Sequence, residues 1–284
     1  GFYTLLVGCT DMGTGCATIL AQMAADCLDC SIDQIAVRGV DTDQSPYDTG
    51  SYASSTTYVT GMAVVKTCQE LREKILAAGA RLLGVSPERA EFDGGRVFLP
   101  ADGREVPLAA IGEAGVMGDS RALSATQAHS SPISPPPFMV GMAEIDLDPD
   151  TGEVDVVDYV AVVDCGTVVN PNLATVQTEG GIAQGIGMAL YEDIQYSPQG
   201  QPRNNSFLQY KIPTRLDLGK IRVAFESSYE PTGPFGAKSI GELVINTPAP
   251  AIANAVANAT GLFFRELPIK AEDIALGLAR RDGG

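Results

Sequence analysis

Glu242 is the residue whose position in the sequence is best suited to general-base chemistry. It ends the segment Gly233-Pro-Phe-Gly-Ala-Lys-Ser-Ile-Gly-Glu242, which also carries Lys238 in a glycine-rich stretch. A carboxylate can accept a proton, whereas a lysine and backbone N–H groups can bind an anionic cofactor. The pattern therefore predicts a site that combines proton transfer with anion binding. An alternative role for Glu242 is a helical-type ion pair with Lys238, four residues earlier.

Two glycine- or hydroxyl-rich segments near the N-terminus could bind an anion. Gly8-Cys-Thr-Asp-Met-Gly-Thr-Gly15 lies between a predicted strand and a predicted helix, and it lacks the Gly-Lys-Ser/Thr ending of an ATP-binding P-loop. Its glycines permit close backbone approach, and the helix start offers N–H groups, although a structural turn is an equal alternative. Gly50-Ser-Tyr-Ala-Ser-Ser-Thr-Thr57 precedes a second predicted helix. Capping is the commoner role of such hydroxyls, but their number here favours a polar ligand.

A third segment, Gln177-Thr-Glu-Gly-Gly-Ile-Ala-Gln-Gly-Ile-Gly187, places four glycines inside a predicted helix. Each interior glycine costs on the order of 1 kcal/mol relative to alanine. This cost can be offset by tight helix packing or by the close approach of a ligand, and the sequence favours neither over the other.

Taken together and in order, these motifs resemble the molybdenum-binding large subunit of the xanthine dehydrogenase and aldehyde oxidase family. The resemblance covers nearly the whole chain, as the C-terminal part of that subunit. It rests on five motifs: Gly8-Cys-Thr-Asp-Met-Gly-Thr-Gly, Gly50-Ser-Tyr-Ala-Ser-Ser-Thr, Asp164-Cys-Gly-Thr-Val-Val-Asn-Pro, Gln177-x-Glu-Gly-x-x-x-Gln-Gly-Ile-Gly and Gly236-Ala-Lys-x-x-Gly-Glu242.

The resemblance implies a role for each matching residue. Glu242 corresponds to the catalytic glutamate, which removes a proton from a hydroxide on molybdenum so that oxygen attacks an electron-poor carbon. Lys238 and Gln177 correspond to residues that hold the pterin. The remaining matches are Met12, Gly13 and Thr14 in the loop over the cofactor, and Ala53, Ser54, Ser55 and Thr56 in the segment that binds its pyrophosphate end or borders the metal. The resemblance implies no metal ligand from a protein side chain.

Three departures from the family pattern affect the substrate pocket. Thr14 stands where many members have glutamine, and Tyr52 stands beside the substrate where the purine enzymes have alanine. The family's other molybdenum-domain half, with its Gly-Gly-Phe-Gly-Gly motif, has no counterpart in this chain. The chain is therefore expected to carry an incomplete active site, possessing the base but lacking part of the substrate-binding surface.

The elements that must position these residues are predicted as a mixture of strands and helices. We expect strands at 2–8, 35–40 and 221–226, a hairpin at 92–99, and a second hairpin formed by 139–147 and 154–163. Helices are expected at 16–28, 54–80, 173–191, 247–259 and 271–280, with a threonine and a proline marking the start of the fourth. Residues 112–137 are interpreted as a connecting loop.

This pattern predicts an α+β fold with two mixed sheet-and-helix lobes. The first molybdopterin-binding lobe is expected at residues 1–120. The second, at residues 121–284, carries the glutamate.

Composition excludes several classes of function. The net charge of −16 argues against binding to nucleic acid or to an anionic membrane, and no apolar run reaches the length of a membrane span. A cytoplasmic location is expected. The six cysteines show no disulfide or ferredoxin-like spacing. Cys27-Leu-Asp-Cys30 would need a second pair of ligands nearby to bind zinc, so ordinary reduced thiols are the favoured interpretation.

The resulting hypothesis is a molybdopterin-binding component of a molybdenum hydroxylase. It would act on an N-heteroaromatic substrate of purine, xanthine or nicotinate type, with a cofactor in the cytosine dinucleotide form. Expected partners are the second half of the molybdenum subunit, an Fe–S subunit and an FAD subunit, as in nicotinate dehydrogenase-like split enzymes. The alternatives are an aldehyde oxidoreductase, a hydroxybenzoyl-CoA reductase subunit, and a non-catalytic cofactor-binding or assembly chain.

Overall fold

The computed structural model describes residues 1–117 and 123–282 and divides the chain into two compact units. Unit 1 comprises Gly1–Pro135 together with Tyr229–Ser239, and unit 2 comprises Pro136–Ser228 together with Ile240–Gly284. The segment that leads to Glu242 therefore belongs partly to each unit. The predicted lobe boundary, between residues 120 and 121, lies outside the described residues.

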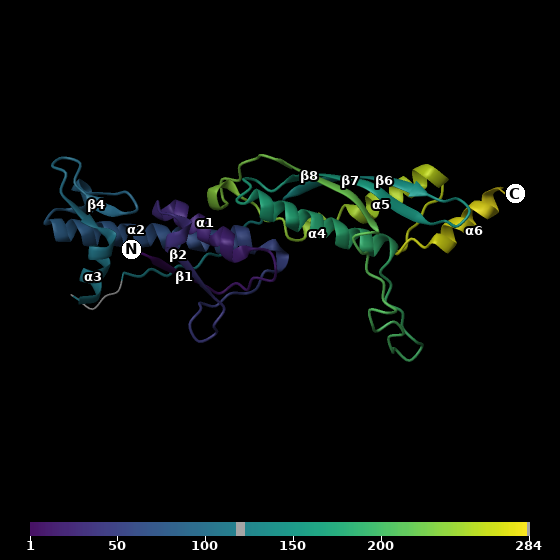
Figure 1. Ribbon diagram of the computed structural model, residues 1–284, viewed down its shortest axis with the longest axis horizontal. Coiled ribbons are helices and arrows are strands. Elements are labelled where there is room, and N and C mark those ends of the chain that lie inside the picture. The colour runs from purple at the N-terminus through teal and green to yellow at the C-terminus, as the bar shows by residue number, and fades with distance from the viewer. Residues whose placement is uncertain (118–122, 283–284) are drawn as a thin grey trace. The chain divides into compact units, whose positions relative to one another are not determined.

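Unit 1 begins with a strand–helix–strand arrangement (Figure 1). Strand β1 (Tyr3–Val7) pairs in parallel with β2 (Ile35–Gly39), and α1 (Cys16–Leu28) connects them. The predicted bounds of α1 are confirmed. The helix forms here because its apolar residues recur at helical spacing and bury one face. The helix ends at Asp29, which adopts a left-handed conformation.

The long helix α2 (Gly61–Leu83) starts later than the sequence indicates. Residues Tyr52–Ser54 form a short 3₁₀ turn and Thr56–Thr60 a π-helical turn, so the prediction of one helix from residue 54 is wrong at its first turns. Ala53 and Ser54 have positive φ angles of 53° and 52°, which an α-helix does not accommodate.

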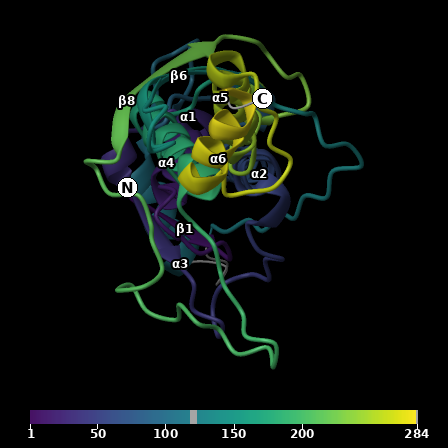
Figure 2. The ribbon, with the colours of Figure 1, turned by 90° about the vertical axis from the view of Figure 1, so that its right-hand side faces the viewer.

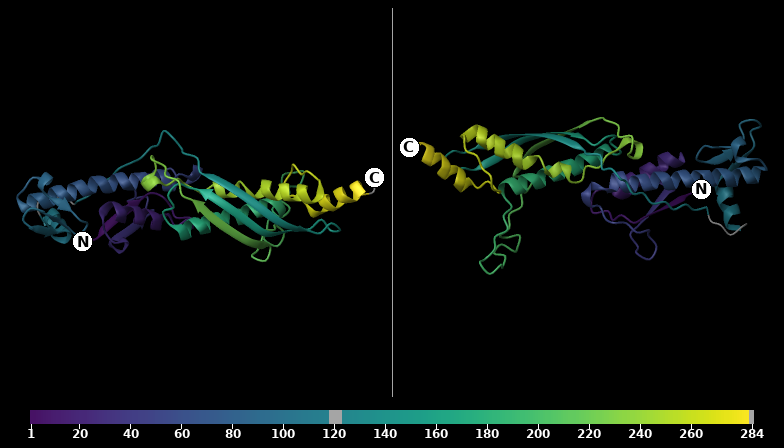
Figure 3. Two further views of the ribbon diagram at one scale, coloured as in Figure 1. Left: turned by 90° about the horizontal axis from the view of Figure 1, so that it is seen from above. Right: turned by 180° about the vertical axis from the view of Figure 1, so that it is seen from behind.

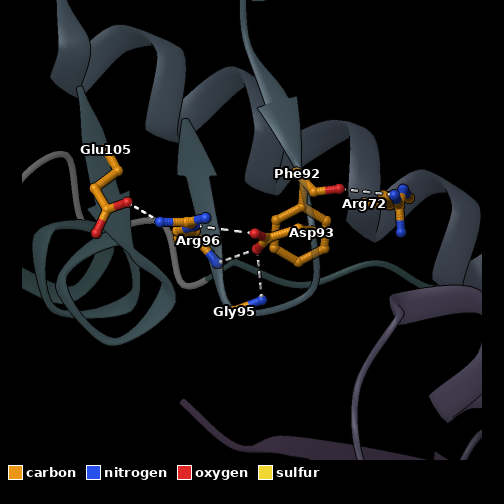
Figure 4. Close-up of polar contacts among 6 residues, drawn as sticks. All are labelled: Arg72, Phe92, Asp93, Gly95, Arg96 and Glu105. Atoms are coloured by element: carbon orange, nitrogen blue, oxygen red, sulfur yellow. Dashed lines mark hydrogen bonds and ion pairs between the residues drawn. The ribbon is translucent and has the colours of Figure 1, made fainter. Parts of the chain in front are cut away.

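A small sheet packs at the other end of α2. Strands β3 (Glu91–Phe92), β4 (Arg96–Phe98) and β5 (Glu105–Pro107) are antiparallel neighbours, and α3 (Leu108–Met117) follows. The predicted hairpin is confirmed, but β5 was not predicted, and the loop expected from residue 112 is helical as far as Met117. Figure 4 shows Arg96 of β4 paired with Asp93 and Glu105, which ties the hairpin to β5.

Unit 2 is built on a three-stranded sheet. Strands β6 (Phe138–Leu147) and β7 (Val154–Asp164) form the predicted antiparallel hairpin, and β8 (Leu218–Glu226) lies parallel to β7. Helices α4 (Pro171–Leu190) and α5 (Pro248–Thr260) lie along the sheet, and α6 (Ala271–Asp282) ends the described chain (Figures 1 and 3). The shared core includes Tyr159, Ile182 and Ile252, each fully buried.

The connection from α4 to β8, residues 191–217, projects away from the sheet and the helices of unit 2 (Figures 1 and 2). Its irregular backbone is interrupted only by an isolated bridge between Tyr196 and Pro202. None of the predicted site residues lies on this connection.

These elements confirm the predicted mixture of helices and sheets in an α+β fold. Within residues 1–117 and 123–282, no helix combines the length and the apolar character needed to cross a lipid bilayer.

Candidate functional site

The loop Gly8–Gly15, between β1 and α1, is organised by Asp11. Its Oδ1 atom accepts hydrogen bonds from the backbone N–H groups of Gly13, at 3.0 Å, and Gly15, at 3.1 Å. Slight burial opposes ionisation of this carboxyl, but hydrogen bonds from backbone N–H groups outweigh it and lower the pKa of Asp11. The side chain thus binds the loop in its ionised form.

The backbone N–H groups that face the Asp11 carboxylate lie mostly in the loop itself. Those of Gly13, Thr14 and Gly15 precede α1, and that of Ala17 belongs to the first turn of the helix. Met12, Gly13 and Thr14 remain exposed on the tip of the loop, and Met12 is 67% exposed. The tip of the loop is therefore open to solvent. An aspartate two and four residues before glycines is a recognisable turn pattern, and it could have identified Asp11.

Gly8 joins this loop to the segment before α2. A Cβ atom on Gly8 would lie 2.3 Å from Pro46 O and 2.8 Å from the Cβ atom of Asp48, so only glycine permits this approach. Asp48 in turn accepts hydrogen bonds from Gly50 N at 2.8 Å and from Thr60 Oγ1 at 3.4 Å. Two motifs separated by about forty residues are thereby held side by side in unit 1.

The hydroxyl-rich segment has an unusual backbone and does not cap the helix that follows it. Ser55 Oγ donates to Gly50 O at 3.1 Å, and Thr56 Oγ1 donates to Ser51 Oγ at 2.8 Å. No side-chain cap hydrogen bond is formed at the start of the π-helical turn. Positive φ angles at non-glycine residues, as at Ala53 and Ser54, cluster at functional sites because they cost energy. The capping alternative is thus not supported.

Tyr58, in the π-helical turn that precedes α2, contacts the segment that carries Lys238. Its backbone N–H donates to Ser239 Oγ at 3.1 Å, and its phenolic oxygen lies 2.7 Å from Thr232 Oγ1. Gly61 adds a close contact, because a Cβ atom there would lie 2.9 Å from Pro234 Cγ. No local signal in the sequence connects Tyr58 with residues more than 170 positions away, and sequence reasoning missed it.

Lys238 is a buried cation, only 8% exposed. The pKa of the Glu230 carboxyl is lowered by hydrogen bonds from Thr232 and by the positive charge of Lys238. The positive charge of Lys238 attracts Glu230, and it can attract an anionic ligand in the same way.

In unit 2, Gln177 fixes the backbone next to Glu242. The Nε2 atom of Gln177, on α4, donates a hydrogen bond to Gly241 O at 3.3 Å. Glu242 is exposed and precedes the 3₁₀ turn Leu243–Ile245, in which Ile245 N donates to Glu242 O at 3.3 Å. One predicted site residue is thus hydrogen-bonded to the residue that directly precedes a second one.

The glycines of α4 explain how this segment approaches the helix. A Cβ atom on Gly181 would lie 2.1 Å from Val244 Cγ2, and one on Gly185 would lie 2.6 Å from Pro248 Cγ. Gly187 is similarly close to Glu192 and Pro213, whereas a Cβ atom on Gly180 would meet no atom within 4 Å. Of the two explanations offered by the sequence, close packing accounts for three of the four glycines.

Helix α5 begins at Pro248, directly after Thr247, as the sequence predicts. The Thr247 side chain does not cap the helix. Its Oγ1 atom instead accepts a hydrogen bond from the buried Tyr159 hydroxyl at 2.8 Å. Gly141 leaves space for this contact, since a Cβ atom there would lie 2.0 Å from the tyrosine oxygen.

The structure therefore distributes the predicted residues over two sets. Unit 1 holds Met12, Gly13, Thr14, Tyr52, Ala53, Ser54, Ser55, Thr56 and Lys238, and unit 2 holds Gln177 and Glu242. Across the residues that the structure describes, no group of three or more His, Cys, Asp or Glu side chains is arranged to hold a metal ion.

Comparison with known proteins gives one family and several relatives. The family model described as "Molybdopterin cofactor-binding domain" matches residues 1–219. A protein of Escherichia coli K12 named "Probable hypoxanthine oxidase" is 34% identical over 99% of this chain. The gamma subunit of the 6-hydroxypseudooxynicotine dehydrogenase complex of Paenarthrobacter nicotinovorans is 31% identical over 96% of it.

A solved structure shares the fold over almost the whole chain. Quinoline 2-oxidoreductase from Pseudomonas putida 86 superposes with a TM-score of 0.87 and 27% identity over 98% of this chain. The chain spans only 29% of the hypoxanthine oxidase, 36% of the gamma subunit and 37% of the quinoline enzyme chain. The similarity thus concerns about one third of each protein.

Proposed function

The chain belongs to the molybdopterin cofactor-binding domain family of molybdenum-dependent oxidoreductases, and on that premise we propose that it is the molybdopterin-binding component of an enzyme that hydroxylates an N-heteroaromatic substrate with oxygen from water. The family assignment confirms the resemblance inferred from the five sequence motifs. The observation that carries the proposed activity is the hydrogen bond from Gln177 to Gly241, because it fixes the backbone beside the only carboxylate assigned to proton transfer.

The residues of unit 1 are chemically suited to the phosphate end of the cofactor. The strained turn at Ala53 and Ser54 leads into a π-helical start that lacks a side-chain cap, and a pyrophosphate is stabilised by such a positive helix end. The hydroxyls of Ser55 and Thr56 add donors or acceptors. Lys238, buried beside Ser239, supplies the positive charge and would hold the pterin.

The remaining unit 1 residues have proposed positions around the same ligand. Met12, Gly13 and Thr14 form the exposed tip that would lie over the cofactor, in the conformation imposed by Asp11. Tyr52 is 69% exposed and would offer a phenol to the substrate. The shorter Thr14 side chain and the larger Tyr52 side chain support a pocket that differs from that of xanthine oxidase.

In unit 2, Glu242 would accept the proton that the attacking oxygen of water gives up. A positioned general base contributes typically 10²–10⁴-fold to a rate. Gln177 would hold the pterin and keep the adjacent peptide in place. When bound, the molybdenum–pterin group supplies the redox centre that takes up an electron pair from the substrate.

The proposed complex extends beyond this chain. Since the chain covers about a third of its relatives, we propose that the second half of the molybdenum subunit, an Fe–S subunit and an FAD subunit complete the enzyme. A cytosine dinucleotide form of the cofactor and a cytoplasmic location belong to the same proposal. Aldehyde oxidation, hydroxybenzoyl-CoA reduction and a non-catalytic assembly role are the competing functions.

The experiment is to purify the chain with its native partners and to measure bound molybdenum, the pterin nucleotide and turnover. The substrate panel contains purines, nicotinate, quinoline, aldehydes and a benzoyl-CoA ester. Incorporation of ¹⁸O from labelled water into a hydroxylated heterocycle is the expected result. Turnover confined to aldehydes or to the CoA ester would replace the proposed substrate class, and bound cofactor without any turnover would favour an assembly role.

A further inference from the structure

The segment Tyr229–Ser239 of unit 1, which we call the lysine loop because it carries Lys238, has an uncommon backbone. Glu230 N donates to Gly236 O at 3.0 Å, which brings the two arms of the loop together. Phe235 has a φ angle of 53°, in the left-handed region that residues with a side chain rarely adopt. Such a conformation costs free energy and persists where surrounding contacts impose it. The source of those contacts is therefore of interest.

Tyr58 contacts the lysine loop near its start and at its end. Its phenolic oxygen lies 2.7 Å from Thr232 Oγ1, and its backbone N–H donates to Ser239 Oγ at 3.1 Å. Its ring lies against Gly233, where a Cβ atom would be 3.2 Å from Tyr58 Cδ2. Tyr58 is only 5% exposed, so these contacts are shielded from water. One residue from the turn before α2 thus spans the loop.

The hydrogen bonds that continue from the Tyr58 hydroxyl have a fixed direction. Thr232 Oγ1 donates to Glu230 Oε1 at 2.5 Å, and Thr232 N donates to the same oxygen at 3.0 Å. Because a hydroxyl carries a single proton, Thr232 Oγ1 must accept the hydrogen bond from the Tyr58 hydroxyl. The phenol therefore donates to Thr232, and Thr232 donates to the Glu230 carboxylate.

The strained residue of the loop is not fixed by burial of its own side chain. Phe235 is 41% exposed, whereas Pro234 before it is buried. A Cβ atom on Gly61 would lie 2.9 Å from Pro234 Cγ, and one on Gly233 would lie 2.0 Å from Ala237 O. The backbone on either side of Phe235 is thus packed closely. The left-handed conformation is held by these contacts and by the hydrogen bonds that the loop makes at its two ends.

We propose that Tyr58 is a positioning residue for Lys238. Its hydroxyl, acting through Thr232, holds the lysine loop in the conformation that sets the place of the buried ammonium group. Lys238 is 8% exposed and directly precedes Ser239, which accepts the hydrogen bond from Tyr58 N–H. Since a lysine side chain is a flexible stem, the place of its charge depends on the backbone that carries it. The proposal rests on the proposed function, in which Lys238 holds the pterin.

The test compares Tyr58→Phe with the unsubstituted protein in its native complex. Phenylalanine keeps the ring against Gly233 and removes only the hydroxyl. Amide hydrogen exchange of peptides from the lysine loop should become faster by up to about tenfold, the effect of one hydrogen bond. Acetylation of Lys238 by an N-hydroxysuccinimide ester, followed by peptide mass spectrometry, should accelerate similarly. Tyr47→Phe, at a 91% exposed position, is the control and should change neither rate.

Substitutions at Thr232 separate positioning by the hydroxyl from space filling by the ring. Thr232→Ser keeps the hydroxyl and should behave like the unsubstituted protein, whereas Thr232→Val should accelerate exchange of the loop. Adding Tyr58→Phe to Thr232→Val should have no further effect, because the phenol acts through the Thr232 hydroxyl. Additive effects of the two substitutions would overturn the proposal, as would unchanged exchange and acetylation in Tyr58→Phe.

Pterin retention distinguishes this inference from the proposed function on which it rests. If Lys238 holds the pterin, the Tyr58→Phe complex should lose pterin on dialysis faster than the unsubstituted complex, by up to about tenfold. Faster acetylation of Lys238 with unchanged pterin loss would support the positioning role of Tyr58 and contradict the cofactor role of Lys238. Unchanged acetylation would overturn the positioning role whatever the rate of pterin loss.

Discussion

The amide of Gln177 donates a hydrogen bond to the carbonyl oxygen of Gly241, across 3.3 Å, and thereby holds the peptide that precedes Glu242. Both partners belong to unit 2, and the contact joins α4 to the loop that precedes α5. The position of the proposed base thus depends on a helix that lies 65 residues earlier in the chain.

Replacing Gln177 by methionine keeps the length of the side chain and removes its donor. A single hydrogen bond of this kind contributes about 0.5–1.5 kcal/mol, so turnover per bound molybdenum should fall by up to about tenfold. Steady-state kinetics normalised to metal content measure the effect. Gln199→Met, at an exposed position on the connection between α4 and β8, is the control. Unchanged turnover per molybdenum in Gln177→Met would show that the contact does not position the base.

The glycines of α4 provide a matched pair for the packing argument. Gly181→Ala should lower the free energy of unfolding by about 1–3 kcal/mol, because the new Cβ atom would lie 2.1 Å from Val244 Cγ2. Gly180→Ala should raise it by about 0.5–1 kcal/mol, since no atom lies within 4 Å and alanine favours the helix. Urea unfolding measures both. Equal effects of the two substitutions would contradict the packing shown by the structure.

The sequence predicts those parts of the fold that depend on local signals. The bounds of α1 and the β6–β7 hairpin were predictable because apolar spacing and the turn Asp148–Gly152 are local signals. Helix α3 was not, since its glycine content resembles that of a loop. The parallel pairing of β7 with β8 was also beyond local patterns, because α4 and residues 191–217 separate the two strands.

The same distinction applies to the candidate site. The types and spacing of Glu242, Gln177 and Lys238 identified them as candidates, with the family resemblance supplying their roles. The bond from Gln177 to Gly241 and that from Tyr58 to Ser239 were not predictable, because each joins distant segments. The occupation of backbone N–H groups by Asp11 depends on the exact turn that the loop adopts.

The contact between Tyr159 and Thr247 predicts a specific loss of stability in unit 2. Thr247→Val preserves the shape of the side chain but leaves the buried tyrosine hydroxyl without its acceptor, at a cost of about 1–3 kcal/mol. Thr247→Ser retains the oxygen and should cost less. Thermal and urea unfolding of both variants test the difference. If serine proved as destabilising as valine, the lost methyl group, rather than the hydrogen bond, would explain the effect.

Asp11 predicts a pH dependence of stability. Its pKa in the folded chain is below its ordinary value of 3.8, so its contribution is present above that value and is lost as the pH falls through the folded pKa. Asp11→Asn keeps an acceptor oxygen but does not titrate. The stability difference between the two proteins should therefore shrink on acidification below about pH 4. Unfolding midpoints measured over this range test the prediction, and a constant difference would contradict it.

The most direct test of the proposed mechanism is the turnover of Glu242→Gln in the native complex, measured beside its molybdenum and pterin content. Glutamine preserves size and polarity but cannot accept the proton. We predict cofactor content equal to that of the unsubstituted protein and turnover lower by about 10²-fold or more on the same heterocyclic substrate. Full cofactor content with unchanged turnover would contradict the assignment of Glu242 as the general base.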